Sequence, residues 1–272
     1  MNYTELTSRK NPTVLQAAAL SADKKSRDST GLFAAEGVKL FGEALDAHVE
    51  VEAVFFTQKA RTLYGELLER VPDARLFLVT DEVYAKLSTE TAPQGIYACL
   101  RKPLAGHLDS AALRAGDFVM LDGLQNPANL GAILRSAFAL GFHRLLLTDT
   151  CADLYAPKCV RAAMGSVFRF IPYFTSDLAD AIREVCAGGK RVFCAALGGS
   201  SVRLGTFAFR SGDSFVIGNE GHGVSQSTAD ACSHRLFIPM CAGAESLNAA
   251  SAAALVMWEM KKDMLLACSA PS

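Results

Sequence analysis

Short apolar runs alternate along the chain with stretches in which apolar residues recur at three- and four-residue spacing. The runs are typical of strands, and the spacing is typical of amphipathic helices. In the first part of the chain, strand-like runs lie at 51–57, 76–80 and 95–100. Helix-like stretches lie at 36–48, 59–70 and 81–87. This alternation predicts a small α/β unit.

The second half of the chain carries longer apolar runs. Five of them, nearly continuous in apolar residues, lie at 118–122, 144–149, 191–196, 214–219 and 235–239. Such runs are typical of parallel strands buried on both faces. A long helix is expected at 246–266, and the stretch 101–117, with a proline and two glycines, is typical of a connection. We therefore predict an α/β protein with two domains, 1–105 and 106–272, the second built on a parallel sheet.

Composition and charge exclude few classes of function. Half of the residues are hydrophobic and a fifth are charged, and the formal net charge is −1, so a polyanion would be bound by a local patch. The polar start and the lack of any run near 20 apolar residues predict a soluble protein in the cytoplasm. The eight cysteines form no CxxC pair or Cys/His cluster, which disfavours a zinc site or a redox dithiol.

Three polar, glycine-containing segments lie where an apolar strand is expected to meet a helix, at 126–137, 215–223 and 238–254. In an open α/β sheet, ligands bind at the carboxyl ends of the strands. We therefore expect one composite site from the polar residues of these segments, which are Asn129, Arg135, Asn219, Glu220, Ser246 and Asn248. No GxGxxG fingerprint in the right place and no P-loop is present, which disfavours nicotinamide or nucleoside triphosphate as the ligand.

Each polar residue has a structural alternative. Arg135 lies one turn beyond Gly131 on a predicted helix and is placed to bind a phosphate, or it is an ordinary surface arginine. Glu220 orients a donor of the site, or it is solvated in a polar turn. We expect Ser246 to cap the long helix, with Asn248 just inside it.

In this order, the segments NPANLGAILRSA, FVIGNEGHGVS and IPM followed by ESLN resemble the three motifs of the SpoU-type (TrmH-like) RNA ribose 2′-O-methyltransferases of the SPOUT superfamily. The block at 155–172 is similar to the sequence between the first two motifs. SRKNP, FAAEGVKL and APQGIYA look like the ribosomal-protein-like substrate-binding domain that often precedes the catalytic one. The resemblance covers nearly the whole chain.

This resemblance implies a trefoil-knotted catalytic domain, a homodimer, and S-adenosylmethionine as cofactor without any metal. The implied catalytic residues are Asn129, Arg135, Glu220, Ser246 and Asn248. The implied cofactor pocket is lined by Gly218, Ile238 and Leu247, with Leu197, Met240 and Asn219 nearby. One departure is Ala163, which stands where many relatives have a serine.

The implied chemistry requires a ribose hydroxyl to lose its proton, so a base or strong polarisation is expected. The pKa of a free arginine lies above about 12, which disfavours Arg135 as a simple base. We expect Arg135 to bind the adjacent phosphate and to stabilise the developing alkoxide, which leaves the proton acceptor open.

Two basic clusters are candidates for RNA backbone contacts. One lies between 130 and 172, where Arg135, Arg144, Lys158, Arg161 and Arg169 outnumber Asp149 and Asp153 by three. The other contains Arg9, Lys10, Lys24, Lys25 and Arg27. The resemblance of the first domain favours ribosomal over transfer RNA. A non-catalytic RNA-binding or assembly factor and a knotted enzyme that methylates a base nitrogen remain open as alternatives.

Overall fold

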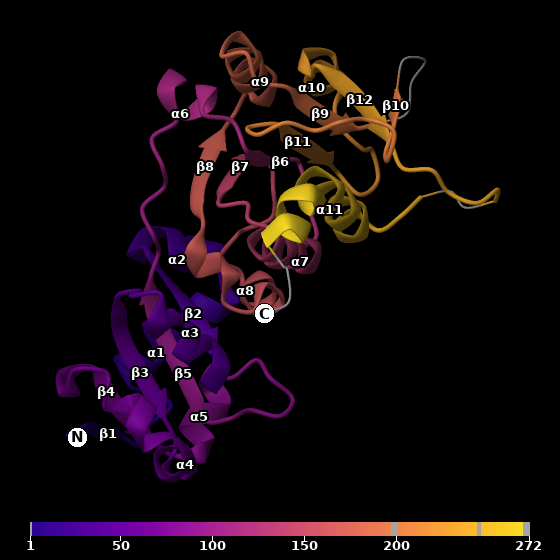
Figure 1. Cartoon of the computed structure of the whole chain (residues 1–272). Helices are drawn as coiled ribbons and strands as arrows, with labels where there is room; N and C mark the ends of the chain where they lie inside the picture. Colours follow the sequence, from indigo (N-terminus) through magenta and orange to yellow (C-terminus); the bar gives the residue numbers. More distant parts are fainter. Residues whose placement is uncertain (1, 197–200, 244–245, 269–272) are drawn as a thin grey trace. The chain divides into compact units, whose positions relative to one another are not determined.

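The computed structural model describes residues 2–196, 201–243 and 246–268 (Figure 1). The chain divides into two compact units. Unit 1 consists of Met1–Pro103 and Asp153–Phe168, and unit 2 consists of Leu104–Ala152 and Arg169–Ser272. Among the described helices, none is long and apolar enough to cross a membrane.

Unit 1 contains a five-stranded sheet of order β1-β4-β3-β5-β2. Its strands are β1 (Thr4–Leu6), β2 (Leu32–Glu36), β3 (Val51–Phe56), β4 (Leu76–Val79) and β5 (Ile96–Arg101). β4 pairs in parallel with β1 and β3, whereas β5 is antiparallel to β3 and β2. The three predicted strands are confirmed as β3, β4 and β5. β1 and β2 lie at the two edges, and the apolar pattern did not reveal them.

The helices in the first segment of unit 1, before Pro103, are α1 (Pro12–Ala22), α2 (Lys24–Thr30), α3 (Val38–Asp46), α4 (Gln58–Leu68), α5 (Asp81–Leu87) and the short 3₁₀ helix η1 (Asp73–Arg75). Local signals explain several ends. α1 begins at Pro12, because the side chain of the preceding Asn11 caps the helix by accepting a hydrogen bond from the Thr13 amide. Asp23 caps the start of α2, and Gly31, with a φ of 67°, caps its end after Thr30.

Unit 2 is built on a seven-stranded sheet of order β10-β12-β9-β11-β6-β7-β8, in which all neighbouring strands run in parallel. The strands are β6 (Phe118–Asp122), β7 (Arg144–Thr148), β8 (Ile171–Thr175), β9 (Val192–Ala195), β10 (Val202–Arg203), β11 (Ser214–Gly218) and β12 (His234–Phe237). The five predicted strands and their parallel arrangement are confirmed. β8 and β10 are additional and lie at the edges of the sheet.

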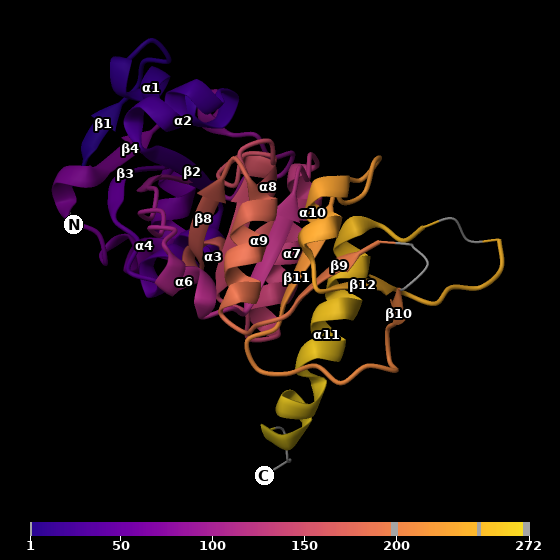
Figure 2. The ribbon, with the colours of Figure 1, turned by 90° about the horizontal axis from the view of Figure 1, so that it is seen from above.

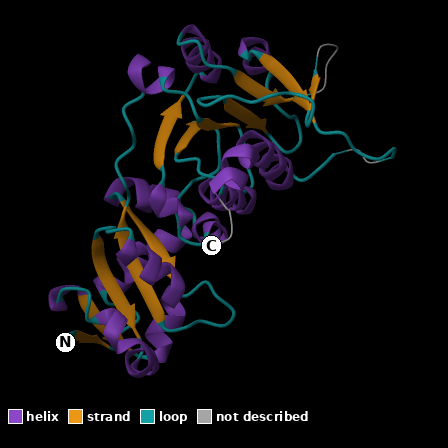
Figure 3. Cartoon of the chain, viewed as in Figure 1, coloured by secondary structure: helices purple, strands orange, loops and turns teal. Residues whose placement is uncertain are grey.

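Helices cover both faces of this sheet (Figures 1 and 2). They are α6 (Ser110–Arg114), α7 (Pro127–Ala139), α9 (Leu178–Ala187), α10 (Gln226–Ala231) and α11 (Ala249–Cys268). α7 packs against α11, while α9 packs against α6 and α10. Figure 3 shows the strands between these two helix groups. Covering both faces removes the central strands from water, and Val119, Met120 and Val216 are fully buried.

The segment between β7 and β8 differs from the prediction of an uninterrupted second domain after residue 105. It contains α8 (Pro157–Ala163) and most of η2 (Ser166–Arg169), and α8 packs on β2 of unit 1. Ala163 is fully buried in α8. The sequence pattern shows local periodicity but not which sheet a helix covers. The assignment of residues 153–168 to unit 1 was therefore not predicted.

Candidate functional site

β6 and β11 are neighbours at the centre of the unit 2 sheet, and their carboxyl ends meet. Gly218, the last residue of β11, pairs with Asp122, the last residue of β6. The loops that follow therefore leave the sheet side by side. The loop after β6 leads into α7, where Asn126 caps the helix by accepting a hydrogen bond from the Ala128 amide at 2.9 Å.

Glu220 joins the loop after β11 to the start of α7. Its Oε1 accepts hydrogen bonds from the Asn126 amide at 3.0 Å and from Nδ2 of Asn129 at 2.9 Å, and its Oε2 accepts one from the Gln125 amide at 3.0 Å. Burial acts to raise the pKa of Glu220, but these hydrogen bonds outweigh it and hold the pKa below the ordinary value. Glu220 is therefore a stable carboxylate at the positive end of a helix.

Asn129 and Asn248 extend this contact to the third polar segment. Asn248 Nδ2 donates to Asn129 Oδ1 at 3.0 Å, and Asn248 Oδ1 accepts from the Ala250 amide at 2.9 Å. A carboxylate accepts only, so Asn129 presents its NH₂ to Glu220 and its oxygen to Asn248. The predicted cap was wrong: Asn248 caps α11, and Ser246 lies two residues ahead of it.

Asn219 and Gly218 shape the turn after β11. Asn219 exchanges two backbone hydrogen bonds with Gly223, at 2.9 and 2.8 Å, and its Nδ2 donates to the Gly123 carbonyl at 2.9 Å. A Cβ on Gly218 would lie 2.1 Å from the carbonyl carbon of Gly223. Only glycine fits at this position, so the turn presents backbone and not side chain at the strand end.

The other predicted cofactor residues follow neighbouring strands. Ile238 comes directly after β12, and β12 and β11 both run parallel to β9, so their carboxyl ends share one edge. Met240 and Leu247 are 41% and 40% exposed. Leu197 lies outside the described residues. No group of three or more described His, Cys, Asp or Glu side chains could hold a metal ion.

Arg135 lies on α7 and is exposed to solvent. It forms no hydrogen bond or ion pair with any residue that the structure describes. Ser246 is likewise exposed and without a hydrogen bond to the described residues. The structure thus joins Asn129, Glu220 and Asn248 directly, while the side chains of Arg135 and Ser246 have no hydrogen-bond partner among the described residues.

A further loop of the site was missed. Gln125 Nε2 donates to the carbonyls of Gly123 and Thr150, and the Gly123 amide donates to Thr148 Oγ1 at 2.9 Å. The Ala152 amide donates to the Leu124 carbonyl at 2.7 Å. These contacts bind the residues after β7 to the loop that starts α7. Thr148 and Thr150, at the end of a predicted strand, were the sequence signal that could have indicated this loop.

The structure also corrects the basic clusters. Arg27 is buried and paired with Asp153, so it cannot contact an RNA backbone in this conformation. Arg161 pairs with Glu90, and Arg144 donates to a backbone carbonyl. The exposed members are Arg9, Lys10, Lys24, Lys25, Arg135, Lys158 and Arg169.

Comparison with known proteins agrees with this arrangement. Residues 117–258 match the SpoU rRNA Methylase family, and residues 11–98 match the MRM3-like substrate binding domain. The 23S rRNA (uridine(2479)-2′-O)-methyltransferase of Streptomyces viridochromogenes is 31% identical over 264 residues, which cover 93% of this chain and 90% of that protein. The 23S rRNA (guanosine(2553)-2′-O)-methyltransferase RlmP of Bacillus subtilis is 28% identical over 240 residues, covering 88% and 92%.

Solved structures show the same fold. A crystal structure of an rRNA methyltransferase from Sinorhizobium meliloti superposes with a TM-score of 0.84 at 27% identity, covering 97% of this chain and 99% of that one. The SpoU methyltransferase AviRb from Streptomyces viridochromogenes, in complex with AdoMet, superposes with a TM-score of 0.81 at 27% identity, covering 94% and 100%. By its sequence and its fold, this chain belongs to the SpoU rRNA methylase family.

Proposed function

We propose that the protein transfers a methyl group from S-adenosylmethionine to a ribose 2′-hydroxyl of ribosomal RNA. The observation that carries this proposal is the hydrogen-bonded chain from Glu220 through Asn129 to Asn248, which joins the three polar segments into one site. The relatives' names add support, because they specify 2′-O-methylation of 23S rRNA.

The edge formed by Gly218, Ile238 and Leu247 is the proposed cofactor pocket, with Met240, Asn219 and Leu197 nearby. The tight glycine turn fits this role, because a pocket that binds through backbone groups needs close backbone approach. When bound, S-adenosylmethionine supplies the activated methyl group. The protein must then orient the ribose and favour loss of its hydroxyl proton.

We assign the polar residues two kinds of role. Arg135, whose exposed guanidinium has no partner within the described part of the chain, binds the phosphate next to the target ribose and stabilises the developing alkoxide. Ser246 is exposed and contacts the substrate. Glu220 is a positioning residue, because its two oxygens already accept three hydrogen bonds and its lowered pKa makes it a weak base. It orients Asn129, which in turn orients Asn248.

Unit 1 is the proposed RNA-binding part, in agreement with the match of residues 11–98 to a substrate binding domain. The exposed lysines and arginines of both units are candidate phosphate contacts. Ribosomal RNA is favoured over transfer RNA by the two relatives named above. The trefoil knot and the cytoplasmic location remain predictions.

A homodimer is also part of the proposal. Phe138 on α7 and Leu255 and Trp258 on α11 are 38%, 44% and 43% exposed, and α7 and α11 pack together. Large apolar side chains gathered on one pair of helices are typical of a protein interface. Light scattering should give the mass of two chains, and Trp258→Glu should shift it toward one.

The activity is tested with tritiated S-adenosylmethionine and RNA from a strain that lacks the gene. We expect label in ribosomal RNA and not in transfer RNA, and none with Arg135→Ala. Label in transfer RNA alone would contradict the assigned substrate. Retained RNA binding without any incorporation would identify a non-catalytic binding factor.

A further inference from the structure

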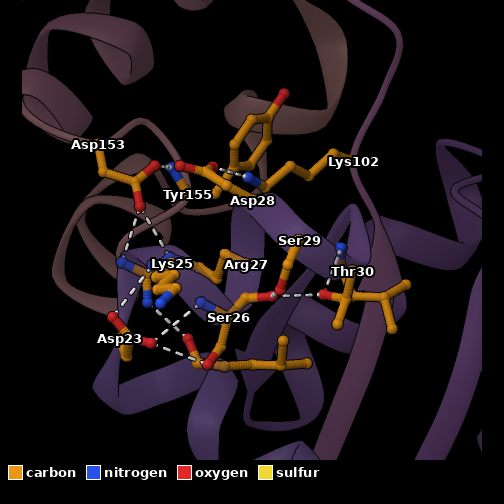
Figure 4. Close-up of polar contacts among 12 residues, drawn as sticks. Asp23, Lys25, Ser26, Arg27, Asp28, Ser29, Thr30, Lys102, Asp153 and Tyr155 are labelled. Atoms are coloured by element: carbon orange, nitrogen blue, oxygen red, sulfur yellow. Dashed lines mark hydrogen bonds and ion pairs between the residues drawn. The ribbon is translucent and has the colours of Figure 1, made fainter.

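Arg27 and Asp153 form a buried ion pair in unit 1 (Figure 4). Nε and Nη2 of Arg27 both lie 2.7 Å from Oδ2 of Asp153, and the two side chains are only 5% and 11% exposed. Nη1 of Arg27 donates to the Leu20 carbonyl at 2.6 Å. Oδ1 of Asp153 accepts from the Tyr155 amide at 2.9 Å. Both charged groups therefore have defined partners on more than one side.

Further contacts hold the start of the same segment in unit 1. The ring of Tyr155 packs 4.9 Å from the ring of Phe33, measured between centroids. Nζ of Lys102 lies 5.3 Å from the Tyr155 ring centroid and 2.7 Å from Oδ1 of Asp28. Figure 4 shows Asp28, Lys102 and Tyr155 beside the ion pair. The segment that begins at Asp153 is thus fixed by charge and by packing.

Asp153 directly follows the loop that contacts the proposed site. The boundary between the two units falls at the peptide bond from Ala152 to Asp153. Consecutive Cα atoms are about 3.8 Å apart, so no linker residue separates the anchored Asp153 from Ala152. In unit 2, the Ala152 amide is bonded to the Leu124 carbonyl, and Gln125 is bonded to the Thr150 carbonyl. The Gln125 amide, in turn, donates to Glu220.

We propose that Arg27 and Asp153 are positioning residues for methyl transfer. By fixing the chain where it leaves residues 149–152, the pair holds Gln125 and the start of α7 in place, and with them the donors that Glu220 accepts. This inference rests on the proposed function. It explains why Arg27, in a basic cluster suited to RNA contacts, is buried. Removing one charge leaves the other buried and unpaired, so Asp153 loses its fixed position.

The test uses the full-length Asp153→Asn variant, which keeps the shape of the side chain and removes its charge. We expect kcat to fall by about tenfold or more, because small displacements of catalytic groups cost up to about a hundredfold in rate. The Kd for S-adenosylmethionine stays at the wild-type value, since other segments form the proposed cofactor pocket. Hydrogen exchange at the amides of Gly123 and Ala152 becomes faster.

Tyr97→Phe is the matched control. It removes buried hydrogen bonds to Ser21 and to the Ala17 carbonyl in the same unit, without touching Asp153. We expect it to lower thermal stability and to leave kcat and the two amides unchanged. If Asp153→Asn does not fold, Arg27→Lys is measured instead, because lysine keeps the charge but has one nitrogen, whereas three nitrogens of Arg27 contact Asp153 and the Leu20 carbonyl.

Two results would overturn the inference: wild-type exchange at Gly123 and Ala152 in the variant, or an equal loss of kcat in Tyr97→Phe. A wild-type protein without methyl transfer would overturn the proposed function instead. In that case the exchange measurement still decides whether the ion pair holds the loop.

Discussion

Replacing Glu220 by glutamine removes the acceptor on which the hydrogen bonds between the three polar segments depend. The carboxylate accepts from the amides of Gln125 and Asn126 and from the side chain of Asn129. A glutamine offers one oxygen, so its NH₂ group must face at least one of these donors. The variant therefore loses at least one hydrogen bond and leaves Asn129 without a fixed orientation.

The magnitude follows from these contacts. A hydrogen bond to a charged group contributes about 1.5–3 kcal/mol when it is buried. Glu220 is solvent-exposed, so water compensates part of the loss, and about 1–1.5 kcal/mol remains. If that energy orients catalytic groups, kcat falls by about tenfold, since 1.36 kcal/mol corresponds to one factor of ten.

The assay compares kcat and KM for methyl transfer in wild type, Glu220→Gln and the control Glu66→Gln, which makes the same charge change at an exposed position of unit 1. We expect a lower kcat in Glu220→Gln alone. Wild-type kinetics in this variant would refute the positioning role. Because the pKa of Glu220 is lowered from 4.5, its stabilising effect is present above pH 4.5 and is lost as the pH falls through the folded value. The acid unfolding of Glu220→Gln should lack this contribution.

Three other predictions follow from single residues. Gly218→Ala should weaken S-adenosylmethionine binding in calorimetry and destabilise the fold by about 1–3 kcal/mol, because its Cβ would lie 2.1 Å from the Gly223 backbone; wild-type affinity would contradict this. Arg135→Lys should lower kcat while unfolding stays within about 0.5 kcal/mol of wild type, because Arg135 has no partner among the described residues. Burial and the charge of Arg191 lower the pKa of His234. The unfolded state therefore binds more protons than the folded state, and stability falls as the pH drops below 6.5. In His234→Phe, the thermal unfolding temperature should depend less on pH below 6.5.

Much of the fold was predictable because the central strands of a parallel sheet are buried on both faces and read as continuous apolar runs. Edge strands lack this signal: β8 has only two buried residues in five and contains Pro172, and β10 has two residues. The placement of α8 in unit 1 depends on contacts between distant residues such as Arg27 and Asp153, which local periodicity does not encode.

The residue types of the candidate site were predictable from the sequence, but the hydrogen bonds between them were not. Strand ends and glycine turns indicated that Asn129, Glu220 and Asn248 belong together, and the structure joins them. Which residue caps α11 could not be decided from spacing, because Ser246 and Asn248 are both good caps. The contacts of Gln125 depend on how two loops meet, which only the sheet order reveals.

The central claim is methyl transfer to a ribose hydroxyl, and the position of the methyl group tests it most directly. Ribosomal RNA labelled by the wild-type protein is hydrolysed in alkali, which cleaves only next to a free 2′-hydroxyl, and the fragments are identified by mass spectrometry. The account predicts one labelled, alkali-resistant dinucleotide with the methyl group on its ribose. Label on a base, in fully hydrolysed nucleotides, would contradict it.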